Sequence, residues 1–152
     1  MTNTNKSPRM TIRVSQSSLA FAIATNENEA QVEYHPYTIK SGVSIAANLR
    51  EAFKTNEELR STNRARLLLD SPVLLVPIEE YREDQNETLF LHSFPSTEGC
   101  VVMNNVIPDL NAVALFAVNK DLKLVMEDNY TDVKFTLMMQ PVWHYLHHRS
   151  FI

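Results

Sequence analysis

The hydrophobic pattern changes period near residue 44, and this change constrains the fold more than any other feature of the sequence. Before it, residues 10–15, 18–25 and 30–39 alternate apolar and polar side chains as strands do. From Ser44 onward the apolar residues fall at helical spacing, with Ser44 as the expected N-cap. Three consecutive strands that lead into a helix predict a sheet with helices packed on it.

The rest of the chain continues to alternate strand and helix patterns. The expected elements are, in chain order, a strand over 64–71, an extended segment over 72–81, a helix over 79–92, strands over 100–107 and 112–118, a helix over 119–129, a strand over 132–138 and a helix over 140–150. The nearly all-apolar segment 64–71 favours a central parallel strand, whereas Pro36 favours an edge position for the third strand. The sequence therefore predicts a mixed α/β sheet, with residues 1–9 as a disordered leader and 10–152 as a single domain.

Charge and composition exclude several classes of function. The formal net charge is −4 and no block is rich in Lys or Arg, which argues against nucleic acid as a partner. Cys100 is the only cysteine, so we expect neither a disulfide framework nor a cysteine metal site. The longest apolar run, residues 112–118, is too short to span a membrane, and the polar start does not read as a signal peptide. We therefore expect a cytoplasmic protein.

Glycine is unusually rare in this chain. Gly42 and Gly99 are the only two glycines, against an average usage of about 7%. Phosphate-binding loops need glycine because their backbone approaches the anion closely and often at positive φ. Neither a GxGxxG nor a GxxxxGK[ST] motif is present. The sequence thus argues against an ordinary nucleotide-binding enzyme, and no cofactor is predicted.

Several apolar stretches resemble a known family. They are SIAANLREAF (44–53), RARLLLDSPVLLVPIEEY (64–81), ETLFLHSFP (87–95) and VVMNNVIPDLNAVALFAV (101–118). Together they resemble an uncharacterised bacterial family of unknown function that carries the actin-like ATPase fold, over about residues 10 to 145. The resemblance implies a ribonuclease H-like domain. Because members of that family continue into a second similar domain, it also implies that this chain corresponds to the N-terminal half of a two-domain protein.

The resemblance also indicates where a nucleotide would bind. Actin-like ATPases carry an Asp in the first strand and a Gly two residues later, where the turn wraps the phosphates. Alignment with this chain places Arg13 and Ser15 at these two positions. A guanidinium has the wrong charge for Mg²⁺, although it pairs well with phosphate. Arg13, Ser15 and Asp70 are therefore weak candidates for nucleotide binding, and the favoured interpretation of Arg13 is an exposed strand residue.

From these substitutions we expect a non-catalytic actin-like protein that acts as a cytoplasmic protein-binding or scaffold module. Its partner would be another protein or the second domain of the same protein. A sheet edge and the C-terminal segment VWHYLHHRSFI (142–152) are the expected contact surfaces. The alternative is a degenerate ATPase whose nucleotide site is completed by a second domain.

Metal-dependent chemistry has weaker support in the sequence. A nuclease of the ribonuclease H type would use Glu51 and Asp70, but Arg13 replaces the carboxylate of the first strand. His144 and His148 are one helical turn apart and would suit a shared metal, but a solvated helix end near the C-terminal dipole is the favoured interpretation.

An acidic run stands at the start of the expected 79–92 helix, formed by Glu79, Glu80, Glu83 and Asp84. Negative charge suits a helix N-terminus, and a basic partner could also use this run. Cys100 has no obvious base nearby in sequence and is interpreted as a small buried hydrophobic residue.

Overall fold

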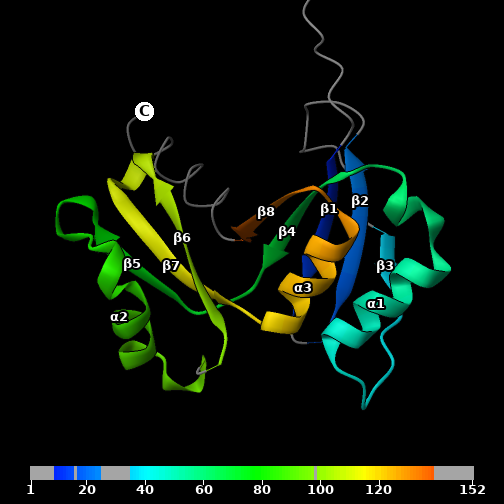
Figure 1. Ribbon diagram of the computed structural model, residues 1–152, viewed down its shortest axis with the longest axis horizontal. Helices are drawn as coiled ribbons and strands as arrows, with labels where there is room; N and C mark the ends of the chain where they lie inside the picture. Colours follow the sequence, from blue (N-terminus) through cyan, green and yellow to red (C-terminus); the bar gives the residue numbers. More distant parts are fainter. Residues whose placement is uncertain (1–8, 16, 25–34, 98, 139–152) are drawn as a thin grey trace, which may run out of the picture. The chain divides into compact units, whose positions relative to one another are not determined.

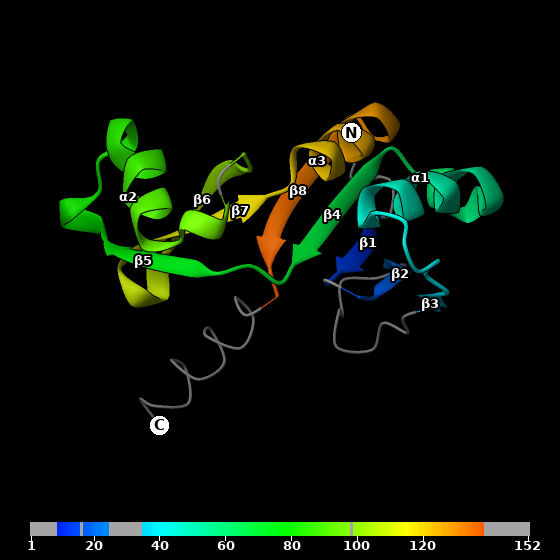
Figure 2. The same ribbon diagram turned by 90° about the horizontal axis from the view of Figure 1, so that it is seen from below.

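A computed structural model describes residues 9–15, 17–24, 35–97 and 99–138, and the chain divides into two compact units (Figures 1 and 2). Unit 1 is formed by residues up to Leu69 together with Asp121–Phe135. Unit 2 is formed by Asp70–Lys120 together with the residues from Thr136 onward. The leader, most of the predicted third strand and the predicted C-terminal helix lie outside the described residues.

Unit 1 is built around a five-stranded mixed sheet in the order β3-β2-β1-β4-β8. Its strands are β1 (Arg9–Val14), β2 (Leu19–Ala24), β3 (His35–Tyr37), β4 (Arg64–Leu69) and β8 (Asp132–Leu137). The first three strands pair antiparallel, and β4 pairs parallel to β1. Figure 2 shows β4 and β8 running in the same direction. The predicted meander, the central position of β4 and the edge position of Pro36 are all confirmed.

The helix that follows the meander begins where the sequence predicts. In α1 (Ile45–Thr55), the N–H of Ala47 donates to the hydroxyl oxygen of Ser44 at 3.1 Å, so Ser44 is the N-cap. The helix buries Leu49 and Phe53. The helix ends at Thr55. The buried residue Leu59 belongs to the short 3₁₀ helix η2 (Glu57–Arg60) that follows.

Unit 1 also contains a helix from the later part of the chain. Helix α3 (Lys120–Asn129) buries Leu122, Val125 and Met126, and Tyr130 follows it into the core. The Tyr130 hydroxyl donates to the carbonyl oxygen of Leu59 at 2.5 Å, and its ring packs edge-on against Phe53 with 5.5 Å between centroids. Burial raises the pKa of Tyr130 well above its ordinary value, which keeps the hydroxyl protonated as a donor.

In its described residues, unit 2 has a three-stranded antiparallel sheet and one α-helix. Its order is β5-β7-β6, formed by β5 (Val73–Pro77), β6 (Val101–Ile107) and β7 (Ala112–Val118), with the helix α2 (Asn86–Ser93). Four of its buried side chains form one hydrophobic cluster: Val76, Phe90, Val113 and Leu115. The predicted mixed α/β class is confirmed, and the strands divide between two sheets.

The helix predicted over 79–92 begins later than expected. Two 3₁₀ turns, η3 (Ile78–Glu80) and η4 (Glu83–Gln85), precede α2, and the backbone is extended at Tyr81 and Arg82. The acidic residues of this stretch stand four positions apart, Glu79 with Glu83 and Glu80 with Asp84. Like charges at this spacing repel on a helix, which disfavours the first two turns of the predicted helix.

Candidate functional site

The turn after β1, where the resemblance to actin-like ATPases predicts phosphate binding, is closed by two serines. The N–H of Ser15 donates to the carbonyl oxygen of Ser18 at 3.0 Å. The two hydroxyl oxygens of Ser15 and Ser18 share a hydrogen bond at 2.5 Å. Both glycines of the chain stand elsewhere, each at positive φ. The polar groups of Ser15 are thus already used within the turn.

Arg13 is exposed on β1, two residues before this turn. It lies on the face opposite to Ile12 and Val14, which are buried, and its register partners are Ala20 on β2 and Leu68 on β4. The structure therefore places Arg13 and Ser15 at successive same-face positions of one strand and its turn. Their predicted binding of a nucleotide stays a prediction.

The two carboxylates considered for a nuclease come from different parts of the chain. Glu51 is half-buried on α1, and Asp70 is exposed directly after β4. No group of three or more His, Cys, Asp and Glu side chains suited to a metal occurs among the described residues. His144 and His148 lie outside these residues, so their proposed metal role stays a prediction.

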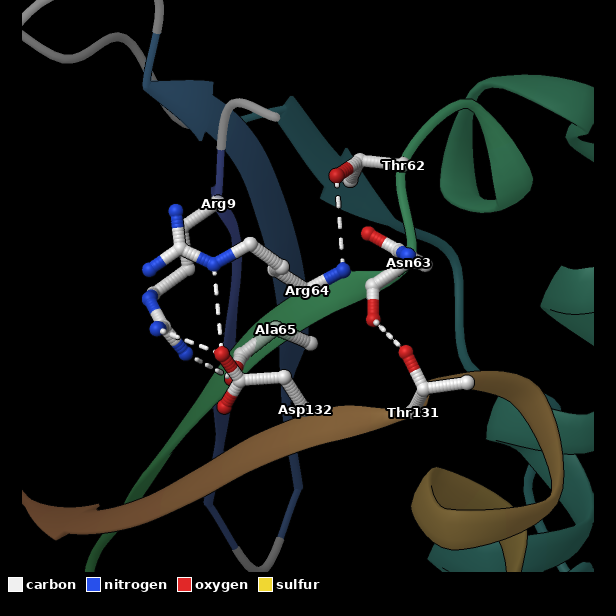
Figure 3. Close-up of polar contacts among 7 residues, drawn as sticks. All are labelled: Arg9, Thr62, Asn63, Arg64, Ala65, Thr131 and Asp132. Carbon is white, nitrogen blue, oxygen red and sulfur yellow. Dashed lines mark hydrogen bonds and ion pairs between the residues drawn. The ribbon is translucent and has the colours of Figure 1, made fainter. Parts of the chain in front are cut away.

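A charged cluster ties together the starts of three strands of unit 1 (Figure 3). Asp132, the first residue of β8, accepts hydrogen bonds from Arg9 of β1 and Arg64 of β4, each at 3.2 Å. Arg9 also donates to the carbonyl oxygen of Ala65 at 2.9 Å. The hydrogen bond from Arg64 chiefly lowers the pKa of the Asp132 carboxyl, burial opposes it, and Arg9 lowers it further. Because β1 runs from Arg9 toward Val14, this cluster is at the opposite end from the Ser15 turn, which suits a structural role.

Unit 2 contains a hollow that sequence reasoning did not identify. Its volume is about 670 Å³, and we call it the α2–β6 hollow. Its lining residues are Glu83, Asn86, Glu87, Leu91, Gly99, Cys100, Val101, Val102, Asn104 and Lys120. Cys100 is half-buried here and not fully buried as the sequence suggested. Glu83, one residue of the acidic run, is among these lining residues.

Asn86 is the unusual residue of the α2–β6 hollow. It is only 8% exposed, and its amide nitrogen donates to the hydroxyl of Tyr81 at 2.8 Å. Its buried side-chain oxygen has no hydrogen-bond partner in the part of the chain that the structure describes. Buried acceptors in native proteins nearly always have a partner, so this oxygen calls for an explanation.

Comparisons with known proteins place the fold. The model of a family described as protein of unknown function (DUF3822) matches residues 1–151, and no curated protein matches. A crystal structure from Bacteroides thetaiotaomicron, of a protein with actin-like ATPase fold and unknown function, is similar with a TM-score of 0.79 and 24% identity, covering 93% of this chain and 56% of that chain. The cytoplasmic domain of EpsL, an inner membrane component of the type II secretion system of Vibrio cholerae, is similar with a TM-score of 0.47 and 16% identity, covering 86% of this chain and 57% of that one.

The similarity to the Bacteroides protein confirms the predicted actin-like fold. This chain spans little more than half the length of each of the two solved proteins. None of the helices within the described ranges has the length and apolar character needed to cross a membrane.

Proposed function

The chain belongs to the DUF3822 family of proteins of unknown function, and from its actin-like fold and its altered phosphate turn we propose that it is a non-catalytic protein-binding module. Its partner is another protein or a second domain of its own protein. The similar Bacteroides chain extends well beyond the matched part, which supports a second domain as one of these partners.

The Ser15–Ser18 turn is the observation that carries this proposal. Phosphate-binding turns offer backbone N–H groups to the anion, usually with glycine so that the backbone approaches it closely. Here the N–H of Ser15 is used by Ser18, and the two hydroxyl groups are bonded to each other. Arg13 stands where a carboxylate would hold Mg²⁺ through its oxygen atoms. Loss of phosphate chemistry accounts for both features.

Isothermal titration calorimetry with Mg-ATP tests the proposal on the longest native form of the protein. We expect no binding heat up to millimolar ATP. The opposite outcome is micromolar binding that is lost in Arg13→Ala and retained in Arg60→Ala, a change of an exposed arginine on η2. That result would replace the proposal with a nucleotide-binding protein in which Arg13 contacts the phosphates.

A further inference from the structure

We propose that unit 2 binds a basic, extended segment of a partner protein along the outer edge of β6, with a lysine or arginine side chain of that segment in the α2–β6 hollow. The inference rests on the proposed protein-binding function and adds the site and the chemistry of the partner. It is carried by the sheet edge, the hollow beside it, the buried oxygen of Asn86 and the charge of residues 70–120.

Strand β6 is the least protected sheet edge in the described part of the chain. Exposed edges are normally blocked by shortness, proline or charge. Strand β3 has three residues including Pro36, β8 carries Asp132 and Lys134, and β5 is bracketed by Pro72 and Pro77. Strand β6 has seven residues, VVMNNVI, with no proline, glycine or charged side chain. Such an edge is suited to pairing with an added strand.

A strand added beside β6 would place every second side chain on one face of the sheet. The α2–β6 hollow lies on that face. Asn104 pairs in register with Leu115, which packs with Phe90 of α2 in the core of unit 2. Val102 and Val106 share this face because they alternate with Asn104 along the strand. Val106 is 54% exposed, so one side chain of an added strand would cover it while a neighbouring one enters the hollow.

The polar groups of the hollow favour a cation. A lysine or arginine side chain carries only donors, and the buried oxygen of Asn86 is an acceptor that has no partner among the described residues. Glu83 and Glu87 add two carboxylates, against one ammonium group from Lys120. The helix dipole of α2 explains negative charge at this position, but it supplies no donor to the side chain of Asn86.

The charge of the surrounding segment points the same way. Residues 70–120 hold eight acidic and two basic residues, a formal net charge of −6, whereas the whole chain carries −4. Complementary charge steers a basic partner toward such a surface and discriminates against acidic ones.

Fluorescence anisotropy with two labelled, capped heptapeptides tests this site on the full chain. One peptide alternates valine with lysine and the other alternates valine with glutamate. We expect the lysine peptide to bind at least about tenfold more tightly, since hydrogen bonds to charged groups are among the strong ones. Glu83→Gln/Glu87→Gln should weaken lysine-peptide binding by about tenfold or more, whereas the matched change Glu79→Gln/Glu80→Gln, outside the hollow, should change it less than about threefold.

Strand addition has its own readout. Alternate N–H groups of a strand point to its two opposite edges, so the backbone nitrogens of the lysine peptide form two sets. Methylation of the set that faces β6 should abolish binding. Methylation of the other set should leave binding unchanged. The proposed site would be wrong if both methylated peptides lost binding equally. It would also be wrong if the two double glutamine variants changed the affinity equally. A dimer of the chain that Val106→Lys dissociates would overturn the site as well, because a second copy would then occupy the edge.

The failure of this site and that of the proposed function are distinguishable. If neither peptide binds and Mg-ATP does not bind either, the peptide site is wrong and the non-catalytic function stands. Binding of Mg-ATP through Arg13 would instead overturn the proposed function, whatever the peptides do.

Discussion

Asp132 shows how one exposed carboxylate holds together elements that are distant in sequence. It accepts hydrogen bonds from Arg9 and Arg64, so the starts of β1, β4 and β8 share a single charged group (Figure 3). Its pKa in the folded protein lies below the ordinary value of 3.8, chiefly because of the hydrogen bond from Arg64. A carboxyl group whose pKa falls on folding stabilises the folded state above its unfolded pKa, and this contribution is lost as the pH falls through the folded pKa.

Asp132→Asn should therefore lower the melting temperature at pH 7, and the difference from wild type should shrink as the pH falls below about 4. Thermal melts between neutral pH and pH 3 measure this convergence. Asp128→Asn, a change of an exposed aspartate on α3, is the matched control and should have little effect. A difference for Asp132→Asn that persists unchanged to the lowest pH would show that the cluster acts through packing and not through its charge.

The sequence was more informative about residues whose partners are close in the chain than about residues whose partners are distant in sequence. Ser44 was recognisable as an N-cap because its partner, Ala47, is three positions away. The cluster of Arg9, Arg64 and Asp132 had no local signal, because its members meet only when the strands pair. The unpaired oxygen of Asn86 was equally hidden, since hydrogen-bond satisfaction depends on tertiary contacts.

Helix α1 and the turn before it depend on a buried polar residue. Asn48 is 1% exposed, and its side-chain oxygen accepts from the N–H of Lys40 at 2.9 Å. Its amide nitrogen donates to the carbonyl oxygens of Lys40, Val43 and Ser44. Gly42, at φ 78°, lets the backbone turn back toward this side chain. Asn48 thus substitutes for the backbone partners that the turn lacks.

Asn48→Ala should reduce the free energy of unfolding by about 2–3 kcal/mol, because several buried backbone groups would lose their partner. Urea denaturation followed by circular dichroism measures the loss. Asn129→Ala is the control, since Asn129 is half-buried and makes one bond, to the carbonyl oxygen of Val125. Equal costs for the two variants would contradict the structural role assigned to Asn48.

The bounds of helices and strands were predicted well where apolar residues dominate the segment. They were predicted poorly where a run of charged residues interrupts the apolar pattern. The interior strand β7 was predicted with its observed bounds, Ala112–Val118, because its seven residues are all apolar. Helix α2 begins at Asn86 and not at residue 79, after an acidic run whose like charges disfavour a helix. The polar residue Asn48 on the buried side of α1 was passed over because the apolar stripe around it masked its role.

For the whole molecule, the element order predicted the fold class but not the pairing of strands. Periodicity identifies a strand and its buried face, whereas its neighbours in a sheet depend on contacts between distant residues. The sequence therefore predicted one mixed sheet, and the structure has a five-stranded and a three-stranded one. Each sheet has its own buried side chains, among them Leu67 on β4 in unit 1 and Leu115 on β7 in unit 2.

These separate sets of buried side chains predict separate responses to matched core changes. Leu67 and Leu115 are both fully buried, so Leu67→Ala and Leu115→Ala should each cost about 2–5 kcal/mol. We expect Leu115→Ala to accelerate amide hydrogen exchange mainly in β5, β6 and β7, and Leu67→Ala to accelerate it mainly in β1, β2 and β4. Hydrogen exchange read by mass spectrometry resolves these segments. Equal acceleration of both sheets by either change would mean that the two units open as one cooperative body.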